Sequence, residues 1–255
     1  RDHMKYLGDS LELIACEKAG IAKPGVPFVV GEKDPRLVEV LRREAKQSVG
    51  KAVGRSGGQK SADVRVLPAD YEWCGPLSLG GPHQRRNAAV AYGILCALPA
   101  PYRPGQAQIE HAFGTAKIPG RLDRRGRWLF DVAHNPDGMR ALVAALAVLR
   151  PARPIHALVS ILGDKEWPDM LVQLDQAIDR GVLTIAPTAA VRGWDIDWLT
   201  RWLRDPSRPP PHAQWTLVPD FREAMDKVQE GAGTILVTGS FHTVGDVMQA
   251  LGMDV

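Results

Sequence analysis

Residues able to bind ligands or react follow an apolar run in the middle of the chain. Asp131, His134 and Asn135 place a carboxylate, an imidazole and an amide in one short stretch. Residues 128–132 are mostly apolar and predict a buried strand, whereas the apolar residues of 142–149 recur at helical spacing. The polar residues are therefore expected at the strand's carboxyl end, where open α/β sheets bind ligands. The alternative is a plain connecting loop in which Asp131 and Asn135 only cap the helix.

The alternation of strand and helix continues to the end of the chain. Strands are expected at residues 128–132, 155–161, 182–186, 215–218 and 234–237, and helices at 137–149, 167–179, 221–230 and 243–251. This order predicts a doubly wound α/β domain with a largely parallel sheet. Polar residues also follow later strands, at 163–165 and 239–242. We expect them to meet at one sheet edge as a ligand crevice, although a solvated loop position is the alternative for Lys165.

The first hundred residues predict βα units of a different domain. Expected elements are a helix over residues 10–22, a strand over 27–30, a helix over 35–47 and an Ala-rich helix within 80–98. The first of these helices begins at Ser10 and includes Lys18. Prolines at 99, 101 and 104 then interrupt regular structure, so the boundary is expected near residues 100–105. The chain is thus predicted to form two domains, residues 1–100 and 101–255.

Composition narrows the class of protein. With 255 residues, of which 45% are hydrophobic, the chain can bury one large core or two smaller ones. The net charge of +3 is small and its basic residues are scattered, which favours anionic small molecules over nucleic acid as partners. No apolar run approaches the roughly 20 residues that span a bilayer. Cys16, Cys74 and Cys96 form no CxxC pair, which favours a reducing compartment. A cytoplasmic monomer without membrane partners is expected.

One stretch resembles a phosphate-binding loop but lacks a glycine that the motif requires. Residues 54–61 approach G-x-x-x-x-G-K-[ST], but Gln59 replaces the second glycine. The stretch also follows a predicted helix instead of a strand, so a flexible surface loop is expected. The chain begins with Arg1-Asp2-His3, with no initiator Met, cap or leading hydrophobic element, as if entered in the middle of a domain.

Six short motifs, in order along nearly the whole chain, match those of one known family. They are Asp2-His3 with Leu7-Gly8, Glu17-Lys18-Ala19-Gly20-Ile21, Arg86-Asn87-Ala88-Ala89, Pro119-Gly120-Arg121, Asp131-Val132-Ala133-His134-Asn135-Pro136 and Gly239-Ser240-Phe241-His242-Thr243-Val244. In this order they resemble folylpolyglutamate synthase/dihydrofolate synthase, an amide ligase of the Mur ligase superfamily. The Glu-Lys-Ala-Gly-Ile and Gly-Ser-Phe-His blocks are specific to the folate branch.

The resemblance implies an α/β fold with part of a central P-loop-type ATPase domain in residues 1–100. A Rossmann-like, doubly wound glutamate ligase domain is implied for residues 101–255. The implied reaction is ATP-dependent: a folate or dihydropteroate carboxyl becomes an acyl phosphate, which the amine of L-glutamate attacks to form an amide. ATP and Mg²⁺ are the implied cofactors, with K⁺ as a further candidate cation, because cations offset charge on a transferred phosphoryl group.

Within residues 1–100, the resemblance gives roles to three residues. His3 matches a metal-ligand histidine, and Lys18 matches a catalytic lysine that reacts with carbon dioxide to form a carbamate near the metal. Partial burial would favour the neutral amine that carbamylation requires. Asn87 matches a residue that binds ATP towards the adenine. The plain alternatives are a terminal histidine, a solvated lysine and a helix-cap asparagine.

In the second half, the resemblance gives roles to four more residues. Arg121 and Asp131 match positions that bind the phosphates and ribose of ATP, and a guanidinium can donate two bonds to phosphate oxygens. His134 and Ser240 fall where the family approaches the incoming glutamate, and His134 is also a candidate catalytic residue. An exposed arginine beside a turn and a capping aspartate are the plain alternatives.

The family's phosphate loop and much of its pteridine pocket have no counterpart in these residues. The resemblance leaves open whether the parent extends folates, makes dihydrofolate from dihydropteroate, or does both. Two other readings stay open as well. The chain could be a nucleotide-binding fragment without catalysis, or it could come from a Mur-type cell-wall ligase that acts on a nucleotide-linked muramyl substrate.

Overall fold

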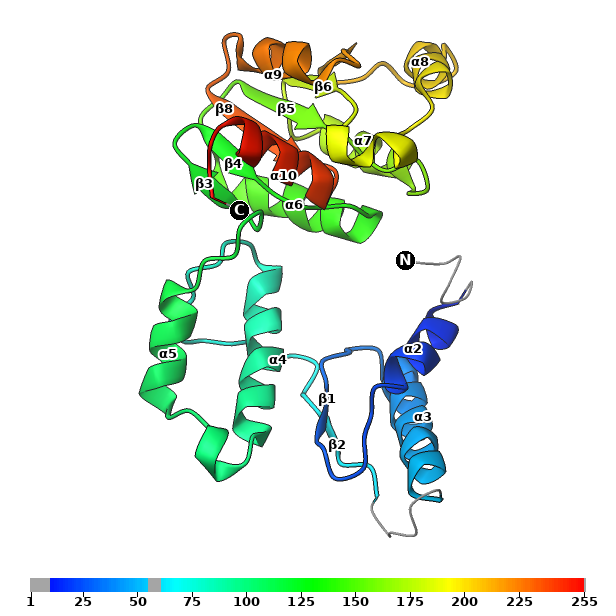
Figure 1. Cartoon of the computed structure of the whole chain (residues 1–255), viewed down its shortest axis with the longest axis vertical. Coiled ribbons are helices and arrows are strands. Elements are labelled where there is room, and N and C mark those ends of the chain that lie inside the picture. Colours follow the sequence, from blue (N-terminus) through cyan, green and yellow to red (C-terminus); the bar gives the residue numbers. More distant parts are fainter. Residues whose placement is uncertain (1–9, 55–60, 255) are drawn as a thin grey trace. The chain divides into compact units, whose positions relative to one another are not determined.

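The computed structural model describes residues 10–54 and 61–254, and Figure 1 shows the elements into which they fold. These residues form two compact units. Unit 1 contains the described residues up to Ser78 together with His83–Ala116. Unit 2 contains Leu79–Pro82 and the described residues from Lys117 onward. His3 and residues 55–60 of the loop tested for phosphate binding lie outside the described residues.

Unit 2 contains a six-stranded sheet. Its strands are β3 (Asp123–Arg125), β4 (Trp128–Phe130), β5 (Ile155–Val159), β6 (Arg180–Leu183), β7 (Gln214–Leu217) and β8 (Thr234–Thr238). Their order across the sheet is β3-β4-β8-β5-β6-β7, and β3 pairs antiparallel with β4 while the other pairs are parallel. The predicted doubly wound α/β fold with a largely parallel sheet is therefore confirmed. The last strand, β8, lies between β4 and β5, so three strand exits are neighbours.

Helices cover both faces of this sheet (Figure 1). They are α6 (Pro136–Leu149), α7 (Trp167–Asp175), α8 (Ile196–Arg204), α9 (Phe221–Gln229) and α10 (Phe241–Ala250), with the 3-10 helix η2 (Pro187–Arg192) before α8. Alternate strand residues point to opposite faces, so Leu129 and Leu236 pack with α6, α7 and α8. Phe130 and Val237 pack instead with α9 and α10. This alternation gives the unit two hydrophobic layers.

Two of these helices begin directly at the edge where β4 and β8 end. Asn135 caps α6 by accepting a hydrogen bond from the Gly138 amide at 2.7 Å, and Pro136 occupies the first turn. Ser240 caps α10 by accepting from the Thr243 amide at 3.1 Å. The capping that sequence reasoning offered for Asn135 is confirmed. Both strand exits therefore lead straight into helix starts, which fixes the loops between them.

Unit 1 is smaller and mainly helical. Its elements are α2 (Leu11–Ala19), β1 (Phe28–Val30), α3 (Pro35–Gly54), β2 (Val64–Val66), α4 (His83–Ala97), the 3-10 helix η1 (Ala100–Tyr102) and α5 (Gln106–Thr115). β1 and β2 form a parallel pair. Ala15 and Ala19 of α2 pack against Leu41 and Ala45 of α3 in a buried cluster. The small side chains on α2 allow the two helices to approach closely.

The two units divide later in the chain than the sequence-based boundary at residues 100–105. Aromatic packing explains the difference. Phe113 of α5 packs edge-on against Trp73, and Tyr92 of α4 packs against the same indole, each with ring centroids 5.1 Å apart. These contacts keep α5 in unit 1, so the division follows Ala116.

Besides the 3-10 helix η2, one strand and one helix of unit 2 are absent from the sequence-based prediction. The strand β3 consists of Asp123, Arg124 and Arg125, whose charges hide its pairing with β4. The helix α8 is amphipathic but lies in a stretch rich in proline and tryptophan, and Asp195 caps it. Among the described residues, no helix combines the length and apolar composition needed to cross a membrane.

Gly239, between β8 and α10, is expected to resist substitution. Its φ is +109°, and a Cβ added there would lie 2.6 Å from the carbonyl oxygen of Ser160. Gly239→Ala should lower the free energy of unfolding by at least about 3 kcal/mol, because backbone strain and a clash with backbone act together. Gly126 is the matched control, since its φ is +64° but nothing lies within 4 Å. Gly126→Ala should cost only about 1 kcal/mol.

Urea unfolding of the two variants and the parent chain measures this difference. Equal losses of stability at Gly239 and Gly126 would contradict the close approach between the ends of β8 and β5.

Candidate functional site

A tight turn places Arg121 beside the end of β4. The Arg121 amide donates to the Ile118 carbonyl at 3.2 Å, and Gly120 has a φ of +69°. Pro119 and Gly120 at the two central positions match a type II turn, which requires a positive φ at its third residue. The Gly120 carbonyl accepts from the Val132 amide at 2.8 Å. The turn is therefore joined by its backbone to the segment that follows β4.

The Asp131 carboxylate joins the same two segments through its side chain. One oxygen, Oδ2, accepts from the Leu122 amide at 3.1 Å, and the other, Oδ1, accepts from the Ala133 amide at 3.0 Å. Leu122 directly follows Arg121, and Ala133 directly precedes His134. Asp131 thus fixes the backbone next to two candidate site residues at once. The structure places Asp131 in this bridging position instead of at the start of α6, which Asn135 caps.

Burying the charged Asp131 carboxylate costs free energy, because the residue is only 8% exposed. Burial raises the pKa of its carboxyl above the ordinary value, by penalising the charged form. The amides of Leu122 and Ala133 oppose this rise in pKa, as do the nearby Arg121 and His134. Loss of solvent outweighs these four favourable interactions, so the pKa of the Asp131 carboxyl stays raised.

Arg121 and His134 meet at the ring of Phe241. The Arg121 guanidinium carbon lies 5.9 Å from the Phe241 ring centroid, within the range of a cation–π contact. The His134 ring centroid lies 5.3 Å from the same centroid, tilted by 46°. Phe241 is 59% exposed, so its ring contacts both polar side chains and is also accessible to solvent. These contacts bring the ends of β4 and β8 together as one site.

His134 is oriented by its own loop. Its Nδ1 lies 2.9 Å from the Val132 carbonyl oxygen. Because a carbonyl can only accept, Nδ1 carries the proton of this hydrogen bond. The bond fixes the direction of the imidazole, which is half-buried. An imidazole held in this way can accept a proton from a ligand or form a hydrogen bond with it.

Ser240 is engaged in a buried hydroxyl network. The Thr243 hydroxyl donates to the Ser160 carbonyl at 2.6 Å, which uses its one proton. The Ser240 hydroxyl, 2.7 Å from that of Thr243, must therefore donate to it while accepting the Thr243 amide. Ser240 is 2% exposed. In this arrangement it ties α10 to β5, and its predicted contact with glutamate stays a prediction.

Lys18 and Asn87 lie in unit 1. In the described part of the chain, Lys18 is exposed on α2. Its side chain therefore lacks the partial burial that would favour carbamylation. Asn87 is on α4, where its side-chain amide donates to the Gln84 side chain at 3.1 Å. Their predicted roles with carbon dioxide and with adenine remain predictions.

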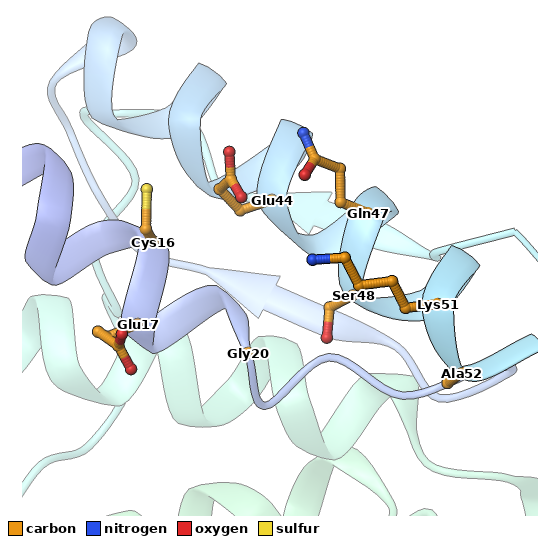
Figure 2. Close-up of a pocket in the computed structure, with 8 residues that line it drawn as sticks. All are labelled: Cys16, Glu17, Gly20, Glu44, Gln47, Ser48, Lys51 and Ala52. Atoms are coloured by element: carbon orange, nitrogen blue, oxygen red, sulfur yellow. The ribbon is translucent and has the colours of Figure 1, made fainter.

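Unit 1 also contains a cavity of about 520 Å³ between α2 and α3 (Figure 2). Cys16, Glu17 and Gly20 line it from α2 and the residue after it, and Glu44, Gln47, Ser48, Lys51 and Ala52 line it from α3. Lys18 does not line this cavity. It is a groove between two packed helices with both acidic and basic side chains at its rim.

The predicted magnesium site finds no complete set of ligands in the described part of the chain. No group of three or more His, Cys, Asp or Glu residues there is arranged to hold a metal ion. His3, the predicted metal ligand, lies outside the described residues, and Lys18 stands without a neighbouring cluster. The donor set that is described does not fit Mg²⁺, and we assign no chemical step to a metal.

Sequence reasoning identified Arg121, Asp131 and His134, and the structure brings these three together. It did not single out Phe241, although the residues 239–242 were expected at a strand exit. An exposed aromatic residue directly after a capping serine is the signal that marks this position. Lys165 is half-buried in the loop after β5, and its amide donates to the Leu162 carbonyl at 3.1 Å.

Asp131→Asn should change the pH dependence of stability. Because the folded state raises the pKa of Asp131, it binds the proton more tightly than the unfolded chain does. The stability contributed by this group therefore falls as pH rises from about 4 through the folded pKa. The variant cannot titrate there, so its stability relative to the parent should increase as pH rises across that window.

The variant should still be less stable overall by about 1–3 kcal/mol, because one amide loses its acceptor. Denaturant unfolding at several pH values measures both effects, with Asp195→Asn as a control at an exposed helix cap. A stability difference that does not vary with pH would contradict the raised pKa.

Comparison with known proteins places this site in a family. Residues 120–241 match the family model described as Mur ligase, glutamate ligase domain. The chain is 29% identical over 261 residues to dihydrofolate synthase/folylpolyglutamate synthase of Escherichia coli, covering 98% of this chain and 58% of that protein. The matched domain begins at the Gly120 turn and ends at Phe241, so it spans the whole group around Asp131.

Two solved structures are similar over nearly the whole chain. E. coli FolC in complex with DHPP and ADP gives a TM-score of 0.71 at 26% identity, covering 99% of this chain and 59% of that one. Mycobacterium tuberculosis folylpolyglutamate synthase complexed with ADP and AMPPCP gives 0.77 at 26% identity, covering 99% and 62%. The chain thus spans less than two thirds of each relative. The described fold corresponds to part of the central domain and to the carboxy-terminal domain of these relatives. The resemblance to folylpolyglutamate and dihydrofolate synthases of the Mur ligase family is therefore confirmed.

Proposed function

We propose that this chain is part of an ATP-dependent ligase that adds L-glutamate to a folate or to dihydropteroate. The observation that carries the proposal is the meeting of Arg121, Asp131 and His134 at the end of β4. This group lies in the domain that matches the glutamate ligase model. Unit 2 would supply this side of the reaction centre, and unit 1 would supply part of the nucleotide-binding domain.

The proposed reaction has two steps. A carboxylate oxygen of the folate attacks the γ-phosphorus of ATP, the bond to the ADP oxygen breaks, and an acyl phosphate forms. The amine nitrogen of glutamate then attacks the acyl carbon, and inorganic phosphate leaves as the amide forms. The amine gives up a proton in this second step. Both steps develop charge on phosphate oxygens, and the second also needs a proton acceptor.

Arg121 is suited to the phosphate oxygens. Its guanidinium can donate two parallel hydrogen bonds to a phosphate, in a planar arrangement that lysine lacks. The turn at Gly120 and the bond from Leu122 to Asp131 fix the backbone on both sides of Arg121. The Phe241 ring lies beneath the guanidinium. Such fixed placement lowers the cost of ordering the side chain when nucleotide binds.

His134 is suited to the amine of the incoming glutamate. The hydrogen bond from Nδ1 to Val132 orients a neutral imidazole, which can take up the proton that the amine loses. Asp131 would support both residues by fixing their loops, and it could also contact the ribose. Asn87, Lys18 and Ser240 keep their proposed roles with adenine, carbon dioxide and glutamate. Mg²⁺ and K⁺ remain proposed cofactors of the whole enzyme.

The ligase activity is tested on the complete gene product that contains these residues. With ATP, L-glutamate and a folate or dihydropteroate, it should release ADP and form the acceptor extended by one glutamate through an amide bond, detected by mass spectrometry. Tetrahydrofolate and dihydropteroate supplied separately distinguish the two synthase activities. If ADP is released only when a muramyl substrate replaces the folate or dihydropteroate, the result would support a cell-wall ligase instead. Nucleotide binding without product from any of these acceptors would support a non-catalytic nucleotide-binding module.

Arg121→Lys should lower kcat/KM for ATP in that enzyme by about tenfold or more, because lysine keeps the charge but loses the two-pronged donor. The matched control is Arg124→Lys, which changes an exposed arginine on β3. We expect the control to stay within about threefold of the parent, as surface changes usually do. Steady-state ADP release measures both. Equal kcat/KM values for the two variants would contradict the proposed contact between Arg121 and the nucleotide.

A further inference from the structure

Unit 2 contains a second cavity, of about 600 Å³, whose lining shares no residue with the group around Asp131. It lies between η2, α9 and α10, and it is lined by both charged and apolar side chains. Cavities that bind small molecules typically measure about 300–1,000 Å³. The volume therefore fits a small organic ligand, and the lining indicates which kind.

Asp246 is the most buried charged residue in the lining of this cavity. Its side chain is 7% exposed, and its Oδ2 accepts from the Thr188 amide at 3.1 Å. Within the described part of the chain, no Lys, Arg or His forms an ion pair with Asp246. A buried carboxylate without a countercharge is energetically costly. One oxygen ties η2 to α10, and the carboxylate has no basic partner among the described residues.

Helix α9 lines the cavity with both apolar and charged side chains. Phe221 and Met225 offer an aromatic ring and a thioether, and both are at least half-buried. Arg222 and Asp226 are exposed at the rim, and neither makes an ion pair among the described residues. The lining thus combines two carboxylates, one guanidinium and an apolar surface. Its buried charge is negative, so the inner part of the cavity complements a cation.

We propose that this cavity binds a small primary amine with an apolar stem, with its ammonium group at Asp246 and its stem against Phe221 and Met225. An ammonium brings three donors to a carboxylate that lacks a countercharge. The aromatic ring adds dispersion and cation–π attraction. A metal ion fits less well, since no group of three metal-binding side chains occurs here or elsewhere in the described residues. The proposal is independent of the ligase reaction.

The test uses the 255-residue chain and three molecules of nearly equal shape. These are 2-phenylethylamine, 2-phenylethanol and phenylacetate, which are cationic, neutral and anionic at pH 7. Isothermal titration calorimetry should detect saturable binding of the amine, with the alcohol and the acid at least about tenfold weaker. Equal binding of all three, or no binding of the amine at millimolar concentration, would overturn the proposal.

Variants then locate the bound amine. Asp246→Asn keeps an oxygen for the Thr188 amide but removes the charge, so it should weaken amine binding by about tenfold or more. Asp197→Asn is the matched control, because it removes an exposed carboxylate on α8. It should leave binding unchanged. Loss of binding in both variants, or in neither, would contradict the assignment to Asp246.

A further variant keeps the test decisive if Asp246→Asn fails to fold. Ala250 is exposed at the end of α10 and lines the cavity, so Ala250→Trp should fill the cavity without touching the bond from Thr188 to Asp246. Its melting temperature should match that of the parent while amine binding falls by about tenfold or more. A folded Ala250→Trp chain that binds the amine as well as the parent would place the amine elsewhere.

Discussion

The candidate site depends on one buried carboxylate that accepts a hydrogen bond from each of two loops. Asp131 binds the amide after Arg121 and the amide before His134, so the position of one residue cannot change without strain on the other. Burial works against this arrangement by raising the pKa of the carboxyl, whereas the two amides favour the charged form. Phe241 completes the coupling, because its ring contacts both Arg121 and His134. Arg121, Asp131 and His134 are thereby held close to one another and to Phe241.

The sheet makes this coupling possible. Because β8 lies between β4 and β5, the segments that follow these strands begin side by side. Gly239 lets β8 turn into α10 close to the Ser160 carbonyl, and the Ser240 and Thr243 hydroxyls connect that turn to β5. The helix starts are thus fixed by side-chain hydrogen bonds within the protein, without a ligand. Such preorganisation is what phosphate and acyl-transfer sites require.

Much of unit 2 could be predicted from sequence because local signals agreed with the final packing. The helix from Pro136 has a capping asparagine, an early proline and helical apolar spacing, and it forms as expected. The strand β3 escaped prediction because Asp123–Arg125 is highly charged and owes its form to pairing with β4. The unit boundary was also hidden, since α5 is kept in unit 1 by long-range contacts such as that between Trp73 and Phe113. Long-range packing of this kind leaves no local trace in sequence.

The same distinction holds for the site. Residue type and position at a strand exit were enough to select Asp131 and His134, whereas Arg121 was selected only through the family resemblance. They could not reveal what each polar atom binds: the side chain of Asp131 bridges two loops, and the hydroxyl of Ser240 is used within a helix cap. Hydrogen exchange at individual amides, measured by NMR in the parent and in Asp131→Ala, tests this account most directly. We predict that the Leu122 and Ala133 amides both exchange at least about tenfold faster in the variant, while the Gly138 amide, bound to Asn135, does not change. Faster exchange at only one of the two amides, or at neither, would contradict the claim that Asp131 couples the loops.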